Sequence, residues 1–183
     1  YLGGHGDVTG GAVISDADRM QGLIALHRLA GAVPSPFDAW LTLRGIKTLA
    51  LRVRQQSENA AAIAAALAVH PKVAKVYYPG VDGEMVPDIF CNTHRGGMIS
   101  FEIAGAERDD VFRFMEALRL IRPTTSLGDV YSLMLYPGMS THRDLDRPER
   151  EAAGVAEGLV RMSAGIEDAS DLILDLEQAL AIV

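Results

Sequence analysis

The chain contains 183 residues, with 17 basic and 24 acidic side chains that give a formal net charge of −7. This length suits one large domain or a piece of a longer polypeptide, and 49% hydrophobic against 22% charged residues excludes a wholly disordered chain. A pI near 5.2 without a basic run argues against nucleic-acid binding. No apolar run approaches the roughly 18 residues that a membrane-spanning helix requires.

The cysteine content and the first residues indicate the setting of the protein. The single cysteine, Cys91, cannot form an internal disulfide, which favours a reducing, cytoplasmic compartment. The opening residues carry no signal-peptide pattern. The chain starts at Tyr1 rather than at a methionine, so we expect that an upstream segment was removed or that the sequence belongs to a longer polypeptide.

The first 31 residues are predicted to form a glycine-rich segment followed by a helix. Five glycines fall within residues 1–11, which indicates either backbone packed closely on another segment or a plain loop that leads into a strand. Residues 15–30 are predicted to be helical, with early acidic residues at the positive end of the helix dipole. Gly31 is expected to end this helix.

The next segment carries the clearest helix-start signal in the sequence. Ser35 can cap the helix, Pro36 fits its first position, and Asp38 lies three residues after the cap. Because the next proline is in the His70-Pro71 pair and good helix formers lie between, we expect one helix over 35–69, about 50 Å long. A helix of this length commonly links two lobes, so we place a domain boundary near that pair.

Short strands and helices alternate in the remainder of the chain. Strands are expected over 73–78, 97–103, 120–123, 159–163 and a short run to 135, and helices over 107–118, 146–153 and 168–182. The polar segment 82–95, which contains Cys91, is predicted to be a loop with a short helix. Several strands lie close enough in sequence to form antiparallel pairs, so this part is predicted to be an α+β lobe with an antiparallel sheet covered by helices.

Arg161 is the most informative side chain for function. Within its predicted strand Arg161 shares one face with Leu159 and Ser163. Its neighbours in sequence, Val160 and Met162, are apolar and point to the other face. Burial of a guanidinium there is costly unless it meets an anion, and its planar fork suits a carboxylate. The anion could be Glu167, Asp168 or the carboxylate of a ligand, and spacing alone favours an internal salt bridge over a substrate.

Other candidate residues are less specific. Ser126 and Gly128 lie in a turn after a strand, where active-site residues often occur, although the turn could equally be chosen for its backbone angles. Thr141-His142 follows a Pro-Gly turn, and a lone histidine is more often structural than catalytic. No histidine lies at metal-ligand spacing with Cys91 or another histidine, so no metal site is expected. These residues alone do not name a reaction.

Eight segments provide a further signal because they occur together. They are Tyr1-Leu2-Gly3-Gly4-His5-Gly6-Asp7, residues 31–39, 44–49, 78–80, 96–101, Ser126-Leu127-Gly128-Asp129, Thr141-His142 and residues 158–168. In order and spacing they resemble the Cys/Met-metabolism family of pyridoxal-phosphate (PLP) enzymes, which includes methionine γ-lyase, cystathionine γ-synthase and γ-lyase, and the O-acylhomoserine sulfhydrylases.

The resemblance implies an α/β fold of the PLP-dependent aminotransferase type (fold type I). Residues 1–57 would be the end of the large PLP-binding domain and a long linking helix, and residues 58–183 the small C-terminal domain. The lysine that bonds the cofactor would directly precede Tyr1, so no catalytic lysine and none of the cofactor's phosphate and ring contacts is expected in this chain. The implied partners are the N-terminal half of the same polypeptide, a small amino-acid substrate, and further copies in a homotetramer built as a dimer of dimers.

The resemblance also assigns three substrate-site residues. Arg161 matches the arginine that binds the α-carboxylate of the substrate. Ser126 matches the serine whose backbone and hydroxyl hold the lysine and substrate near the cofactor, and Thr125 precedes it. Cystathionine-handling members carry a glutamate at the position of Thr125, and threonine cannot supply its charge.

These matches favour one substrate class without settling the substrate. Thr125, with Gly6-Asp7 and Gly128-Asp129, favours a methionine γ-lyase or a sulfhydrylase. The function we expect is a carbon–sulfur lyase that performs α,γ-elimination, most like methionine γ-lyase. The alternatives are an O-acylhomoserine sulfhydrylase or a cystathionine γ-synthase or γ-lyase, and His27-Arg28 replaces the Lys-Asp that methionine γ-lyases tend to carry. A free-standing, non-catalytic binding lobe is the alternative outside the enzymes, and the absence of an initial methionine favours the enzyme.

Overall fold

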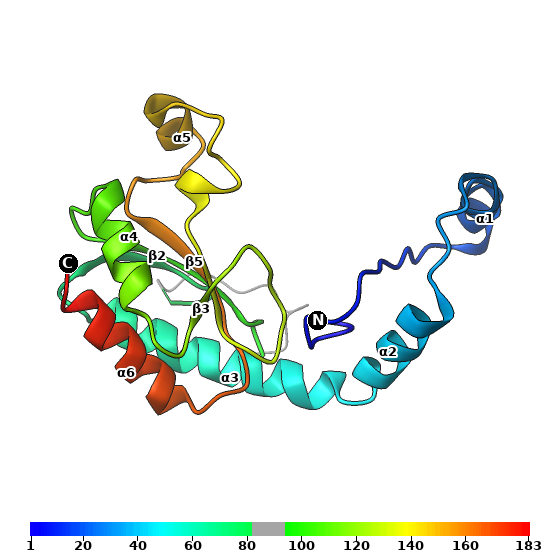
Figure 1. Cartoon of the computed structure of the whole chain (residues 1–183), viewed down its shortest axis with the longest axis horizontal. Coiled ribbons are helices and arrows are strands. Elements are labelled where there is room, and N and C mark those ends of the chain that lie inside the picture. The colour runs from blue at the N-terminus through cyan, green and yellow to red at the C-terminus, as the bar shows by residue number, and fades with distance from the viewer. Residues whose placement is uncertain (82–93) are drawn as a thin grey trace.

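The computed structural model describes residues 1–81 and 94–183, in which an extended arm leads into a lobe built on a sheet (Figure 1). The arm, residues 1–46, contains α1 (Ala17–Ala30) and α2 (Pro36–Ile46). The helix α3 (Leu49–Ala68) connects the arm to the sheet lobe. The loop expected over 82–95, with Cys91, lies almost entirely outside the described residues.

Local capping defines the helices of the arm as the sequence predicts. The Asp16 side chain accepts a hydrogen bond from the Arg19 N–H at the start of α1, and Gly31 ends this helix in the left-handed conformation. The Ser35 hydroxyl accepts the Asp38 N–H at 3.1 Å, and Pro36 opens α2. Each cap depends on residues at most four positions apart, which is why the sequence reveals it.

The prediction of a single long linking helix over 35–69 is wrong. The helix is interrupted at residues 47–48, between α2 and α3. The Gly45 carbonyl would accept the N–H of residue 49 in a continuous helix. Instead it accepts the Arg52 guanidinium at 2.8 Å and the Thr48 N–H at 3.2 Å. A Cβ at Gly45 would also overlap the carbonyl oxygen of Gly3. The break therefore follows from packing of the first residues against α2, not from a local helix breaker.

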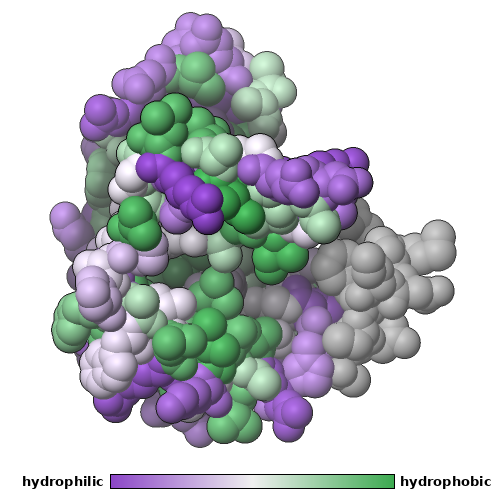
Figure 2. Space-filling view, turned by 90° about the vertical axis from the view of Figure 1, so that its right-hand side faces the viewer, coloured by the Kyte–Doolittle hydropathy of each residue, from purple (hydrophilic) through white to green (hydrophobic). Residues whose placement is uncertain are grey.

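The arm leaves many apolar side chains uncovered. No residue of α1 is buried, and the exposed apolar side chains of the arm include Leu26, Leu29, Phe37, Trp40 and Leu43. Figure 2 looks onto the arm and shows apolar side chains gathered around a hollow. That hollow is lined by residues of the first segment, of α1 and α2, and of the loop 126–129.

The sheet has five strands in the order β1-β2-β5-β4-β3. Their bounds are β1 Val73–Tyr77, β2 Met98–Ile103, β3 Arg122–Pro123, β4 Leu133–Leu135 and β5 Leu159–Ser163. Three pairs are antiparallel, but β3 and β4 are parallel, so the expected antiparallel sheet is corrected to a mixed one. A parallel pair needs a crossover connection. Residues 124–132 provide it, and this excursion carries Ser126–Asp129 to the first residues of the chain.

Helices cover one face of the sheet and enclose the core. They are α3, α4 (Arg108–Ala117) and α6 (Ala169–Leu180), while α5 (Arg147–Ala152) and a 3₁₀ turn (Pro137–Met139) lie beyond the sheet (Figure 1). The rings of Phe101 and Phe114 meet edge to face in this core, with centroids 6.0 Å apart. Val160 and Met162 of β5 are fully buried in it. The other face of β5 therefore carries Arg161, as the predicted alternation requires.

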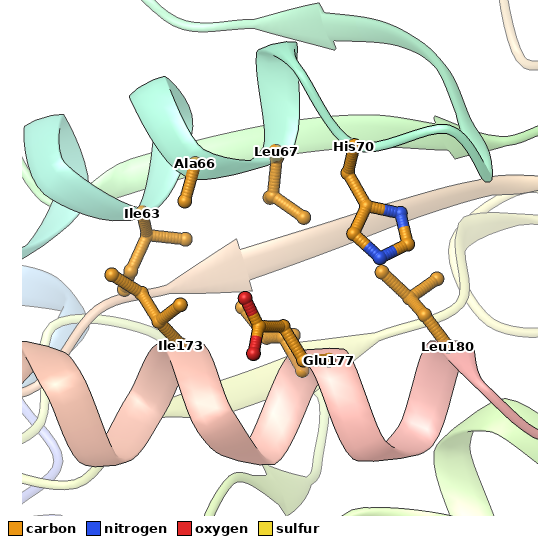
Figure 3. Close-up of a pocket in the computed structure, with 8 residues that line it drawn as sticks. Ile63, Ala66, Leu67, His70, Ile173, Glu177 and Leu180 are labelled. Atoms are coloured by element: carbon orange, nitrogen blue, oxygen red, sulfur yellow. The ribbon is translucent and has the colours of Figure 1, made fainter.

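A shallow pocket lies between α3 and α6. Figure 3 shows Leu67 and His70 on one side of it and Glu177 and Leu180 on the other. The pocket is largely apolar and lies on the helical side of the sheet, opposite the face that carries Arg161. It reflects helix packing and is separate from the candidate substrate-site residues Thr125, Ser126 and Arg161.

A partly buried polar cluster connects α5 to the sheet lobe and predicts an acid-sensitive contribution to stability. The Tyr136 hydroxyl donates to the Glu157 carboxylate at 2.7 Å, and Arg150 forms an ion pair with it at 2.6 Å. The hydrogen bond from Tyr136, followed by that from Arg150, holds the pKa of Glu157 below its usual value. A lowered carboxyl pKa stabilises the fold above the unfolded-state pKa of about 4.3, and this contribution is lost as the pH falls through the folded-state pKa.

We expect Glu157→Gln to lower the free energy of unfolding of the full-length protein by about 2 kcal/mol at pH 7. Below about pH 4 the difference from wild type should shrink, because Glu157 of the unfolded wild-type chain then binds a proton more readily than the folded protein does, which removes the wild-type advantage. Urea unfolding at pH 7, 5, 4 and 3.5 measures it. A difference that stays constant over this range would contradict the assignment.

Candidate functional site

The first residues of the chain dock beside the loop 126–130. A Cβ at Gly128, whose φ is +76°, would lie 2.6 Å from the Tyr1 backbone nitrogen, so glycine is needed for this approach. The Val130 N–H donates to the Gly4 carbonyl at 3.0 Å. The Gly128 N–H donates to the Ser163 hydroxyl at 2.9 Å. The contacts bring residue 1, the loop and β5 to one place.

Arg52 of α3 joins the first residue to the end of α2. Its side chain donates to the Tyr1 carbonyl at 2.9 Å, to the Gly45 carbonyl at 2.8 Å and to the Thr48 hydroxyl at 3.2 Å. A Cβ at Gly4, whose φ is +71°, would overlap the guanidinium. The glycines of the first segment thus serve close backbone packing, the first of the two interpretations that their density allows.

Asp129 holds the loop through its backbone and its side chain. The buried Gln56 amide donates to the Asp129 carbonyl at 2.7 Å, and the Asp129 carboxylate accepts the Val130 N–H at 2.6 Å. A Cβ at Gly6 would lie 2.5 Å from this carboxylate. The Gly6-Asp7 and Gly128-Asp129 pairs of the sequence signal therefore meet in space.

Arg161 lies half-buried on β5, two residues before the Ser163 that binds the loop. In residues 1–81 and 94–183 its side chain has no hydrogen bond or ion pair. Glu167 instead accepts the Ser132 N–H at 2.7 Å and the Ser132 hydroxyl at 2.9 Å. Asp168 caps α6 by accepting the Ser170 N–H. The internal salt bridge that spacing favoured is therefore absent from the described part of the chain.

Thr125 and Ser126 are exposed on the excursion between β3 and β4. Ser126 lines the hollow together with Tyr1, whereas Thr125 and Arg161 lie outside its lining. The contact between the sheet and this loop is made by Ser163, which lies on the same strand as Arg161. The structure thus places Tyr1 and Ser126 in the lining of one hollow. Arg161 lies one strand repeat from Ser163, whose hydroxyl binds Gly128 of the same loop.

Sequence reasoning missed the buried polar stripe of α3. Arg52, Gln56 and Asn59 are each at most 4% exposed, and Asn59 donates to the carbonyls of Gly165 at 3.0 Å and Glu167 at 2.7 Å. The three residues follow the i, i+4, i+7 spacing of one helix face. Polar residues at that spacing within an alanine-rich helix are the signal that could have been read. They indicate a helix face whose side chains hydrogen-bond to backbone carbonyls of other segments instead of facing solvent.

Metal-ligand clusters, membrane-spanning helices and the environment of His142 can be assessed within residues 1–81 and 94–183. Within them, no three His, Cys, Asp or Glu side chains are grouped so that they could hold a metal ion. In this same part of the chain, no helix is both long and apolar enough to cross a bilayer. The Thr141 hydroxyl lies 2.8 Å from Nδ1 of His142, so this histidine has a local partner.

Comparison with known proteins gives a consistent result over the whole chain. A model of the family described as Cys/Met metabolism PLP-dependent enzyme matches residues 1–181. The chain is 42% identical over 180 residues to the L-methionine gamma-lyase of Streptomyces avermitilis, covering 98% of this chain and 40% of that protein. It is 43% identical over 183 residues to the cystathionine gamma-synthase of Mycobacterium tuberculosis, covering 98% and 46%.

A solved structure agrees with the sequence relatives. The crystal structure of cystathionine gamma-lyase from yeast superposes with a TM-score of 0.91 at 41% identity, covering 100% of this chain and 48% of that one. The chain therefore spans less than half the length of these relatives, and its α/β fold is that of fold type I PLP enzymes. It belongs to the Cys/Met-metabolism family of PLP-dependent enzymes.

Proposed function

We propose that the full-length protein is a PLP-dependent carbon–sulfur lyase that acts on sulfur amino acids, most like methionine γ-lyase. The observation that carries this proposal is the half-buried guanidinium of Arg161, which has no internal partner among the described residues. The relatives named above are a methionine γ-lyase, a cystathionine γ-synthase and a cystathionine γ-lyase. Their names refer to methionine and cystathionine, which are both amino acids with sulfur in the side chain.

Arg161 would bind the α-carboxylate of the substrate through two parallel hydrogen bonds. Such a contact fixes the orientation of the substrate, so that the bonds to be broken face the reacting groups. The rigid position of Arg161 supports this role, because β5 pairs with a strand on each side. The exposed hydroxyl and backbone of Ser126 would hold the lysine and the substrate from the loop.

The catalytic lysine would directly precede Tyr1, beside the hollow that Tyr1 and Ser126 line. The lining offers hydroxyl and backbone groups, His27, and the carboxylates of Asp38 and Asp129, but no lysine or arginine for a phosphate among its described residues. It therefore fits a wall of the cofactor site away from the phosphate. The phosphate and ring contacts would then come from the N-terminal half of the polypeptide. When bound, PLP withdraws electrons from the substrate Cα, which acidifies the proton there.

Thr125 supports an uncharged substrate side chain. It is exposed on the same loop as Ser126, and its hydroxyl carries no charge that could bind the distal ammonium of cystathionine. We therefore propose α,γ-elimination from methionine ahead of γ-replacement. The exposed His27 and Arg28 of α1 leave an O-acylhomoserine sulfhydrylase or a cystathionine enzyme as the second candidate.

The uncovered apolar side chains of the arm support assembly with other chain segments. We propose that the N-terminal half of the polypeptide and neighbouring copies cover them in a homotetramer built of dimers, in a cytoplasmic setting. The division into a large-domain end over 1–57 and a small domain over 58–183 remains part of this proposal.

The test uses the full-length protein. We expect an intact mass well above 19.6 kDa, a visible absorption band from the bound cofactor, and release of a thiol and a 2-oxo acid from methionine. Cystathionine and O-acylhomoserines with a thiol are the comparison substrates, and faster turnover of either would select the second candidate. A native chain of 19.6 kDa without the band would instead support the free-standing binding lobe.

A further inference from the structure

Arg52 is a buried arginine that is not one of the proposed substrate-site residues Arg161, Ser126 and Thr125. It is 4% exposed, yet no carboxylate among the described residues forms an ion pair with it. Burial lowers the pKa of its guanidinium, and the charge of Asp129 opposes this effect. Because a buried charge is costly without good compensation, an arginine at this position needs a reason beyond packing.

Its hydrogen bonds suggest that reason, because one side chain joins three segments of the chain. The donors reach the carbonyl of Tyr1, the carbonyl of Gly45 at the end of α2, and the hydroxyl of Thr48 in the break before α3. The break in the helix frees the Gly45 carbonyl for this contact. Gly4 leaves the room for the guanidinium that any side chain would occupy.

Tyr1 is consequently held at both of its backbone ends. Its carbonyl accepts the Arg52 hydrogen bond, and its nitrogen packs against Gly128. Consecutive Cα atoms lie about 3.8 Å apart across a trans peptide, so fixing Tyr1 also fixes where the preceding residue can be. We propose that Arg52 is a positioning residue for the residue before Tyr1, and this inference rests on the proposed function, which makes that residue the catalytic lysine.

A lysine amine lies at the end of a flexible four-carbon side chain, so the amine is placed accurately only if the lysine backbone is fixed. Misplacement of a reacting group by about 1 Å can lower a rate by about 10²-fold. Loss of the Arg52 contacts should therefore reduce turnover more than substrate binding, since Arg161 and the sheet that binds the substrate carboxylate stay in place.

The variants Arg52→Gln and Arg52→Lys of the full-length protein test this proposal. Arg52→Gln should lower kcat by about 50-fold with KM changed by less than about threefold. The titration midpoint of the cofactor's visible band should also move by at least about 0.5 pH unit, because the lysine in contact with the cofactor is displaced. Arg52→Lys keeps the charge and one donor, so it should recover part of kcat. Arg54→Gln, an exposed neighbour on α3, is the matched control and should behave as wild type.

The outcomes separate this inference from the proposed function. Wild-type protein without the visible band or lyase activity would overturn the function itself. An active wild type with an Arg52→Gln variant of unchanged kcat and unchanged titration midpoint would overturn the positioning role alone, even if the variant unfolds at lower temperature. If Arg52→Gln does not fold, Arg52→Lys decides: wild-type kcat and midpoint in that variant would likewise overturn the role.

Discussion

Replacing Arg161 by alanine is expected to lower kcat/KM for the sulfur amino-acid substrate by about 10³-fold. Hydrogen bonds to charged groups contribute about 1.5–3 kcal/mol each, and the planar guanidinium can form two of them with one carboxylate. Two such bonds amount to about 4 kcal/mol, which is close to three powers of ten. Arg161→Lys keeps the charge but loses the fork, so we expect an intermediate loss of about 10²-fold.

The role of Arg161 can be separated from a structural effect with paired ligands. Methionine and its analogue without the carboxylate, 3-(methylthio)propylamine, should differ strongly in affinity for the wild type and little for Arg161→Ala. Arg113→Ala removes an exposed arginine of α4 and serves as the control, with kcat/KM unchanged. If Arg161→Ala retained the wild-type preference for the carboxylate, another residue would have to bind that group.

Replacing Asp175 by alanine is expected to lower the free energy of unfolding by about 3 kcal/mol. Asp175 of α6 is 6% exposed, and its carboxylate accepts the N–H groups of Arg119 at 2.9 Å, Leu120 at 3.0 Å and Ile121 at 2.9 Å. Truncation leaves these donors without an acceptor, and each buried unsatisfied group costs about 1–3 kcal/mol before water compensates part of it. The connection from α4 to β3 should therefore loosen.

Urea unfolding of the full-length protein at pH 7 measures this loss. Glu177→Ala is the matched control, because Glu177 lies on the same helix, is exposed, and should change the stability by less than about 0.5 kcal/mol. Asp175→Asn should also destabilise, since its amide presents an N–H₂ group to donors. An Asp175→Ala variant within about 0.5 kcal/mol of wild type would show that the three N–H groups find other acceptors.

Much of the secondary structure could be predicted because the information is local. The alternation around Arg161 gave the correct faces of β5, and the Ser35, Pro36 and Asp38 pattern gave the correct start of α2. The candidate site was predictable mainly through the resemblance of eight segments to one family, not through spacing alone. The boundary at residue 57 stays a prediction, since α3 continues through it.

The sequence by itself determined the strands, the caps and the family, because these depend on side-chain alternation, on hydrogen bonds within one turn, and on motifs in register. Only the tertiary structure decided the helix break at 47–48, the parallel pairing of β3, and, within residues 1–81 and 94–183, the absence of an ion pair to Arg161. In each case a contact between distant segments competes with the local preference. The Arg52 to Tyr1 hydrogen bond spans 51 residues and the Gln56 to Asp129 bond spans 73, distances over which periodicity and capping carry no information.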